Sequence, residues 1–247
     1  MLEYPKRIRL AAPALLLALG TVAGGAFAAD PGRIHGKVTG LDKLIPDVYA
    51  EAADAKNHRY NWREASPTVP LQHRALYGNP SREVVIGVFT NSNQNPFEPI
   101  KVKVTGGRTN PSMLVVPPNT RLSFTNVDPF PHKLYQVNDP KFAPNVTGVG
   151  SARDWTAGSQ GRYEIRDEFF PSLRTYIVVE PQVVAQANPS RSGEFSIDKL
   201  PPGDFTLRAY FNGKPVGKDT PSFHIPDKGG SVDLKSDWNI APAGDAK

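Results

Sequence analysis

The sequence predicts an all-β protein made of β-sandwiches, and three observations lead to that class. Proline (25) and glycine (21) punctuate the 247 residues at short intervals. Between them lie short runs rich in Val, Ile, Phe, Tyr and Thr, which favour strands. No long segment has the apolar spacing of an amphipathic helix. Short strands separated by frequent turn signals are typical of a mainly antiparallel sandwich.

The predicted strands alternate in polarity or form short apolar runs. In residues 121–127 the apolar side chains fall on every second position, which places one face in a core and the other in water. Residues 206–211 show much the same pattern. In chain order, strands are expected at residues 34–38, 84–90, 100–105, 113–116, 121–127, 133–137, 162–165, 175–180, 183–187, 194–197, 205–211, 222–225 and 232–234.

The segments between these strands are of two kinds. Residues 117–120 and 212–214 contain Asn, Gly or Pro and are expected to form tight turns. Residues 53–80, by contrast, mix aromatic, charged and proline residues without a sustained period, so residues 57–81 are interpreted as an irregular connection or a binding loop. The tail, residues 241–247, is small and polar and is expected to fray.

Residues 1–28 resemble an export signal. Lys6, Arg7 and Arg9 precede an apolar stretch, and Ala28 ends a run of small residues typical of a cleavage site. The apolar stretch is short of the about 20 residues that a membrane helix needs. We therefore expect a periplasmic or secreted protein with no membrane span after signal removal, with an uncleaved N-terminal anchor as the alternative.

Charge and sulfur content exclude several functions. The net charge is +5, and removal of residues 1–28 takes away three basic residues and one acidic residue, leaving +3. Basic and acidic residues alternate along the chain rather than forming a basic stripe, so no nucleic acid partner is expected. The chain has no cysteine, which excludes a disulfide, an iron–sulfur cluster and a c-type haem.

Residues 126–132 read Asn-Val-Asp-Pro-Phe-Pro-His. This segment resembles a ligand loop of bacterial plastocyanin-like cupredoxins, which often carry the label methylamine-utilisation proteins. Relatives of that kind have the pattern Asn-x-Asp-x-x-x-His, which Asn126, Asp128 and His132 match. The resemblance implies a cupredoxin-like antiparallel sandwich over residues 82–180. A blue-copper ion, however, requires a Cys thiolate with two imidazoles.

The second ligand loop of that family is altered in this chain. Aligning the family's proline with Pro171 and its aromatic residue with Tyr176 puts Asp167 at the cysteine position, Phe170 at the histidine and Leu173 at the methionine. The resemblance therefore implies that three of four copper ligands are absent. Phe170 and Leu173, with Phe169 beside them, are expected to fill the volume of the metal site.

A second resemblance lies near the C-terminus, where residues 192–209 are similar to carboxypeptidase regulatory-like, transthyretin-like domains. A strand with Phe195 and Ile197 inward, a Pro-Pro-Gly turn at 201–203 and a further strand fit this family. Its opening Gly-x-Val strand matches residues 36–38. We therefore predict a split transthyretin-like or Ig-like sandwich of residues 33–56 plus 181–236, with the cupredoxin-like part inserted. A strand 34–38 unpaired with any strand after residue 180 would exclude this nesting.

Two roles remain open for His132. It is expected mainly to be a structural histidine whose ring is held by a backbone carbonyl or by Asp128, because one imidazole does not make a metal site. Alternatively, His132 with Asp128, Asp167 and Glu168 forms a nitrogen and oxygen site for Cu(II) or Zn(II). No cofactor is predicted.

The predicted function is that of an exported, non-enzymatic scaffold that binds or supports a cell-envelope protein or glycan. No motif of a hydrolase elbow, zinc protease helix or phosphate loop occurs in the sequence. A periplasmic copper or zinc carrier is the first alternative, and a hydrolase with residues that meet only in space is the second. Surface aromatics offer a binding platform if exposed, namely Tyr60, Trp62, Tyr77, Trp155 and Tyr163.

Overall fold

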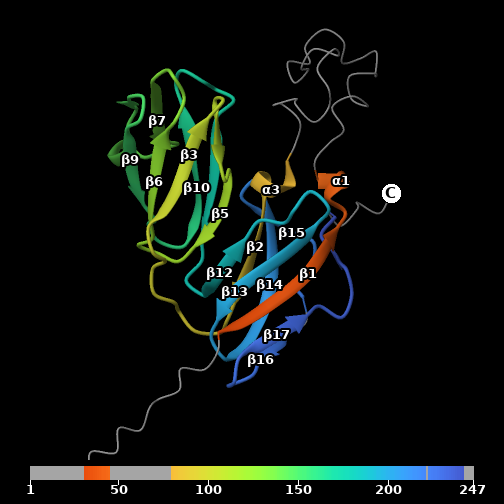
Figure 1. Ribbon diagram of the computed structural model, residues 1–247. Helices are drawn as coiled ribbons and strands as arrows, with labels where there is room; N and C mark the ends of the chain where they lie inside the picture. The colour runs from red at the N-terminus through yellow and green to blue at the C-terminus, as the bar shows by residue number, and fades with distance from the viewer. Residues whose placement is uncertain (1–30, 45–78, 221, 242–247) are drawn as a thin grey trace, which may run out of the picture.

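Residues 31–44, 79–220 and 222–241 are described by the computed structural model, and their regular secondary structure consists almost entirely of β-strands (Figure 1). The predicted all-β class is confirmed. Helical turns are short: α1 (Leu41–Leu44), α3 (Pro80–Glu83) and a 3-10 turn at Pro140–Phe142. None of the helices within the described ranges is long and apolar enough to cross a membrane.

The first sandwich packs two sheets around one apolar core. One sheet has the order β13-β1-β17, with β18 also paired to β1, and the other has the order β12-β2-β14-β15, with β16 paired to β14. Its core contains Ile34, Val88, Ile197 and Leu207. The bounds are β1 Gly32–Thr39, β2 Val84–Phe89, β12 Val183–Ala187, β13 Glu194–Leu200, β14 Gly203–Phe211, β15 Lys214–Val216, β16 Phe223–Ile225, β17 Gly230–Asp233 and β18 Trp238–Asn239.

The second sandwich is built from the middle of the chain. Its sheets have the orders β5-β11-β10-β7-β8 and β4-β3-β6-β9, and they enclose a core that includes Val102, Phe124, Leu134 and Ile177. The bounds are β3 Ile100–Thr105, β4 Arg108–Asn110, β5 Met113–Val116, β6 Arg121–Asn126, β7 His132–Gln136, β8 Asn145–Thr147, β9 Ala152–Thr156, β10 Gly161–Asp167 and β11 Arg174–Val179.

Strand β2 belongs to the first sandwich, which corrects the predicted boundary at residue 82. It pairs with β12 and β14 rather than with any strand of the second sandwich. All of its residues are buried because successive side chains face two different cores. Val88 lies in the core of the first sandwich, while Val85 and Phe89 face the second sandwich. Periodicity alone could not reveal this, because a strand buried on both faces has no polar side.

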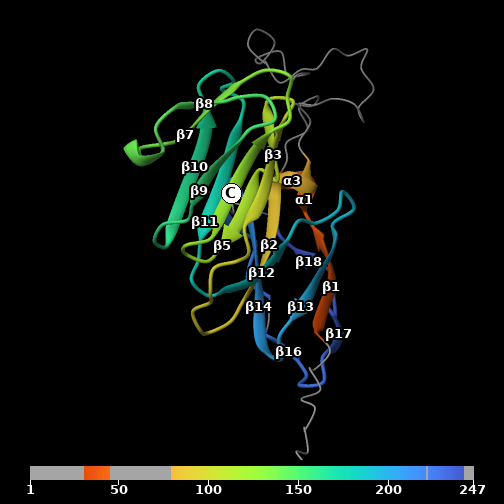
Figure 2. The ribbon, with the colours of Figure 1, turned by 60° about the vertical axis from the view of Figure 1, so that its left-hand side comes forward.

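The two sandwiches lie side by side (Figure 2), and an apolar layer of side chains joins them. Met113 and Val115 of the edge strand β5 pack there with Val178, against Val85 and Tyr210 of the first sandwich. The amide of Val115 donates to Gln186 Oε1 on β12 at 2.8 Å, so a side chain from the first sandwich satisfies one amide on the free edge of β5. The four sheets are therefore stacked as two sandwiches in contact.

Among the described strands, β1 pairs only with those that follow residue 180 in the chain. It is antiparallel to β13 and parallel to β17 and β18. The nested arrangement would have been excluded if β1 had no partner after residue 180, and β1 does have such partners. The predicted signal (1–28), most of the irregular connection (57–81) and most of the tail (241–247) lie outside the described residues.

Several short strands were not predicted, namely β4, β8, β9, β15 and β18. In β9 only Trp155 is buried, so the segment lacks an alternating apolar signal. Strand β15 begins directly after the predicted Asn212–Gly213 turn, in which both residues have positive φ (50° and 74°), as a two-residue hairpin turn requires. Most pairings are antiparallel, as expected, whereas β3–β6, β5–β11, β1–β17 and β1–β18 are parallel.

Candidate functional site

The structure brings together three of the side chains that the sequence singled out. His132 is the first residue of β7, Asp128 lies in the loop that precedes it, and Asp167 ends β10. Strands β7 and β10 pair with Asp167 opposite Leu134, so the two loops meet at one end of the second sandwich. These three residues are called the His132 cluster below.

Both ring nitrogens of His132 contact carboxylate oxygens. Nε2 lies 3.0 Å from Asp128 Oδ2, and Nδ1 lies 2.9 Å from Asp167 Oδ2. The ring is fully buried. An ionised carboxylate can only accept hydrogen bonds, so the ring satisfies both partners when both of its nitrogens carry protons. The predicted contact of His132 with Asp128 is present, and Asp167 is a second partner.

Asp167 is held in place by backbone amides. Its Oδ1 accepts from the amides of Phe169 (2.7 Å) and Phe170 (2.9 Å), and its Oδ2 accepts from the amide of Lys133 at 3.0 Å. The carboxylate therefore orders the loop after β10 and holds the His132 ring at once. A buried carboxylate with this many donors is a structural centre rather than a free ligand.

Asp128 is held by a glycine turn that the sequence analysis missed. Gly106 and Gly107 have φ of 60° and 64° and connect β3 to β4 as a two-residue hairpin, which turns both amides toward Asp128. Those amides donate to Oδ1 (2.6 Å) and Oδ2 (3.1 Å). The Gly-Gly pair directly after a predicted strand was the signal available for this turn.

The ionisation of Asp128 responds to these contacts. Burial alone would raise its pKa, but the amides of Gly106 and Gly107 and the His132 ring together hold the pKa below its ordinary value. Because the pKa in the folded protein is then lower than in the unfolded chain, Asp128 stabilises the fold above its unfolded pKa of about 3.9. That contribution is lost as the pH falls through the folded pKa.

The Asp128→Asn variant is expected to lose about 1–3 kcal/mol of stability at pH 7, because a neutral amide gives weaker hydrogen bonds. Urea unfolding at pH 7 and at successively lower pH measures both effects. Wild-type stability should fall more steeply below pH 4 than that of Asp128→Asn. Parallel curves for the two proteins would contradict the assignment.

Aromatic rings enclose the imidazole. The centroids of Phe130 and Phe170 lie 5.3 and 4.9 Å from that of His132, and 4.8 Å from each other. Leu173 is fully buried in the core of the second sandwich. Phe170 therefore packs against the His132 ring as expected, and Leu173 is buried in the core. Half of Phe169 (50%) is exposed, so the expectation for that residue was wrong.

Glu168 is not a helper of His132. Its Oε2 pairs with Lys133 Nζ at 2.6 Å on the outer face of the sheet, because successive residues of a strand point to opposite faces. Across the described ranges, no group of three or more His, Asp or Glu side chains is arranged to hold a metal ion. In the His132 cluster the carboxylate oxygens point at the ring nitrogens rather than at a shared point.

The donor set does not fit a blue-copper ion. Such an ion needs a thiolate and a second imidazole, whereas the corresponding positions carry Asp167, which is bound to backbone amides, and Phe170, which packs on the His132 ring. One polar atom nearby lacks a partner among the described residues: Thr147 Oγ1, on the residue opposite His132 in β8.

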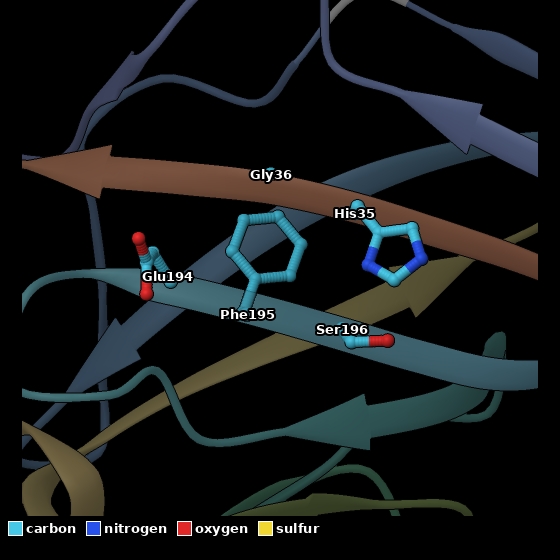
Figure 3. A pocket seen from close by; sticks show the side chains of 5 residues that line it. All are labelled: His35, Gly36, Glu194, Phe195 and Ser196. Carbon is cyan, nitrogen blue, oxygen red and sulfur yellow. The ribbon is translucent and has the colours of Figure 1, made fainter.

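A surface hollow of about 450 Å³ lies elsewhere, on the outer face of the β13-β1-β17 sheet (Figure 3). His35 and Ser196 line it and lie opposite each other in register, and Asp233 lies opposite His35 on β17. No hydrogen bond between described residues joins these three side chains, and Ser196 Oγ donates instead to Asp198. The hollow is open and lacks the linked geometry of a nucleophile and its base.

The predicted aromatic platform is wrong for Trp155. Its ring is buried and its Nε1 donates to Gln136 Oε1 at 2.6 Å. Tyr163 is half-buried, packs edge-on against Trp155 and donates to the Ser159 carbonyl. Tyr60, Trp62 and Tyr77 lie outside the described residues.

Comparisons with known proteins add a fold likeness at low similarity. No family model matches the chain, and no curated protein matches it. A reduced amicyanin variant is 20% identical, with a TM-score of 0.31 over 38% of this chain and 99% of amicyanin. A copper-containing nitrite reductase from Thermus scotoductus is 23% identical, with a TM-score of 0.30 over 38% of this chain and 25% of the reductase.

A purple cupredoxin from Nitrosopumilus maritimus is 18% identical, with a TM-score of 0.29 over 33% of this chain and 99% of the cupredoxin. All three structures are similar to part of this chain only. At these values the likeness carries no conclusion about family or function.

Proposed function

We propose that this chain is an exported, non-enzymatic β-sandwich scaffold that binds or supports another component of the cell envelope without a bound metal. The observation that most supports this is the state of the His132 ring. Both of its nitrogens contact buried carboxylates, and two phenylalanine rings pack around it. Both nitrogens of the His132 imidazole are thereby occupied in holding two loops together, and neither is left to bind a metal ion or to transfer a proton.

The rigidity of this end of the sandwich also supports a scaffold role. Asp167 and Asp128 tie the turn after β3 and the loop after β10 to His132 through backbone amides. A buried network in which each member has its partners fixes one arrangement of its loops. Export is proposed from residues 1–28 alone.

A copper or zinc carrier is the second candidate, and one observation favours it. Thr147 Oγ1 is a buried oxygen that no described residue satisfies, and it lies opposite His132 in the β7–β8 pair. Together with the carboxylates of Asp128 and Asp167 it would offer oxygen donors near an imidazole, a set that Cu(II) or Zn(II) accepts without sulfur.

Metal titration of the purified protein distinguishes the two candidates. We expect less than one equivalent of Cu(II) or Zn(II) to be retained, and no increase in the melting temperature on adding either ion, because a ligand that binds the folded state raises it. Metal content after dialysis and a thermal melt are the measurements.

Two matched variants locate any metal that is retained. His132→Gln removes the buried imidazole, whereas His224→Gln removes an exposed one that also contacts a carboxylate, Asp204 Oδ1 at 2.9 Å. One equivalent bound by the wild type, lost in His132→Gln and kept in His224→Gln, would establish the carrier and exclude the metal-free scaffold.

A further inference from the structure

The outer face of the β5-β11-β10-β7-β8 sheet is covered only in part. Met113 and Val115 of β5 face the first sandwich. Farther across the sheet, Ile165 and Leu134 point into the core of the second sandwich, so the alternate residues of β10 and β7 point outward. These strands lie on the side of the sheet away from β5.

Arginine and tyrosine side chains dominate that open part. Arg166 of β10 lies directly opposite Arg174 of β11 on one side and Tyr135 of β7 on the other. Tyr176 of β11 lies opposite Glu164 and is partly buried at the border with the apolar layer between the sandwiches. Arg162 is exposed one step farther along β10. These five residues are called the Arg–Tyr face: Arg162, Arg166, Arg174, Tyr135 and Tyr176.

The positive charge of this face is incompletely balanced. Like charges directly opposite each other in neighbouring strands are unfavourable, and Arg166 faces Arg174 in this way. Glu164 Oε1 lies 2.9 Å from Arg166 Nε. Arg174 is exposed and has no carboxylate within ion-pair distance among the described residues. An anionic partner would relieve this repulsion.

Arg162 is positioned by its surroundings. Its guanidinium carbon lies 5.0 Å from the centre of the Tyr176 ring, at cation–π distance. Its Nε and Cδ lie close to Gly213 of the β14–β15 turn, so a Cβ at that position would require the Arg162 side chain to move. A guanidinium held in this way presents its planar fork with little further ordering, which suits bidentate recognition of a carboxylate.

We propose that the Arg–Tyr face binds an acidic segment of a partner protein, which rests on the binding role proposed above. Arg162 lies over the Tyr176 ring, and the ring is partly buried against the apolar layer, which leaves little of it for stacking on a sugar or a nucleobase. Glu164 on the face itself, and Glu168 beside it, oppose a closely spaced phosphate backbone. Separated carboxylates of an extended peptide reach the arginines without meeting these two residues.

The test uses the full mature chain and a labelled peptide that alternates glutamate and serine. Fluorescence anisotropy at low salt measures binding, with the peptide carrying glutamine for glutamate as the neutral control. The Arg162→Gln/Arg174→Gln variant is expected to bind five- to tenfold more weakly, as the loss of two charge-assisted contacts implies. The matched control is Lys101→Gln/Lys103→Gln, which removes two exposed charges from β3 in the opposite sheet.

Each outcome decides for or against the Arg–Tyr face. Selective loss of binding in the arginine variant supports it. Equal loss in both variants would show a net-charge effect, and no binding by the wild type at low salt would also overturn the proposal. Tighter binding of polyphosphate or a sulfated glycan than of the glutamate peptide would assign the face to another polyanion. The metal titration described above tests the metal-free scaffold independently of this experiment. A failure of peptide binding would therefore not change the result of the metal titration.

Discussion

Replacing Asp167 by alanine is expected to lower the free energy of unfolding by about 3–5 kcal/mol. The substitution removes the partner of His132 Nδ1 and leaves the amides of Lys133, Phe169 and Phe170 without their acceptor. Buried donors without acceptors are costly, and a buried ring that has lost one of two carboxylates is costlier. Urea unfolding followed by circular dichroism at pH 7 measures the change.

The neighbouring residue supplies the control for Asp167. Glu168→Ala removes an exposed ion pair with Lys133 on the other face of β10, and such pairs contribute about 0–1 kcal/mol. The two substitutions remove carboxylates one residue apart, so only the buried network differs. Equal, small effects of both would mean that the His132 cluster does not hold the loops of this end together.

Replacing Val115 by aspartate is expected to cost about 3–5 kcal/mol and to separate the unfolding of the two sandwiches. Val115 is fully buried in the apolar layer between them, and a carboxylate there has no basic partner among the residues of that layer. Hydrogen exchange followed by mass spectrometry resolves the two sandwiches, because β1 and β13 belong to one and β3 and β6 to the other.

The control for Val115 is Val146→Asp, on β8 of the same sheet. Val146 is 56% exposed, so the same change there is expected to shift stability by less than about 0.5 kcal/mol. In the wild type, both sandwiches should exchange in one cooperative unit. Unchanged co-operativity in Val115→Asp would show that the apolar layer does not couple them.

The sequence predicted the individual strands better than their partners. The alternation at residues 121–127 corresponds to β6, whose residues alternate between buried and less buried positions. In a strand with one face in the core and one in water, apolar and polar side chains alternate, so the sequence itself shows the period of two. Strand β2 carries no such period, since it is buried on both faces. Its membership of the first sandwich depends on pairing with β14, more than a hundred residues away.

The candidate site shows the same division. Asp128 and His132 were found from their spacing, and the alignment of the second loop placed Asp167 near them. The contribution of Gly106 and Gly107 was missed, because the amides of a turn leave no side-chain pattern to recognise. Glu168 and Phe169 were misplaced, since alternation along β10 and the loop after it decides which side chains face His132.

The sequence by itself determined the all-β class, the absence of any thiolate chemistry and the residue types at the two loops. Only the tertiary structure decided that both nitrogens of His132 are taken by carboxylates and that Arg166 and Arg174 stand side by side. The physical reason is that strand propensity and the period of apolar residues depend on residues that are neighbours in the sequence. Hydrogen bonds and charge contacts instead depend on strand register between segments far apart in the chain.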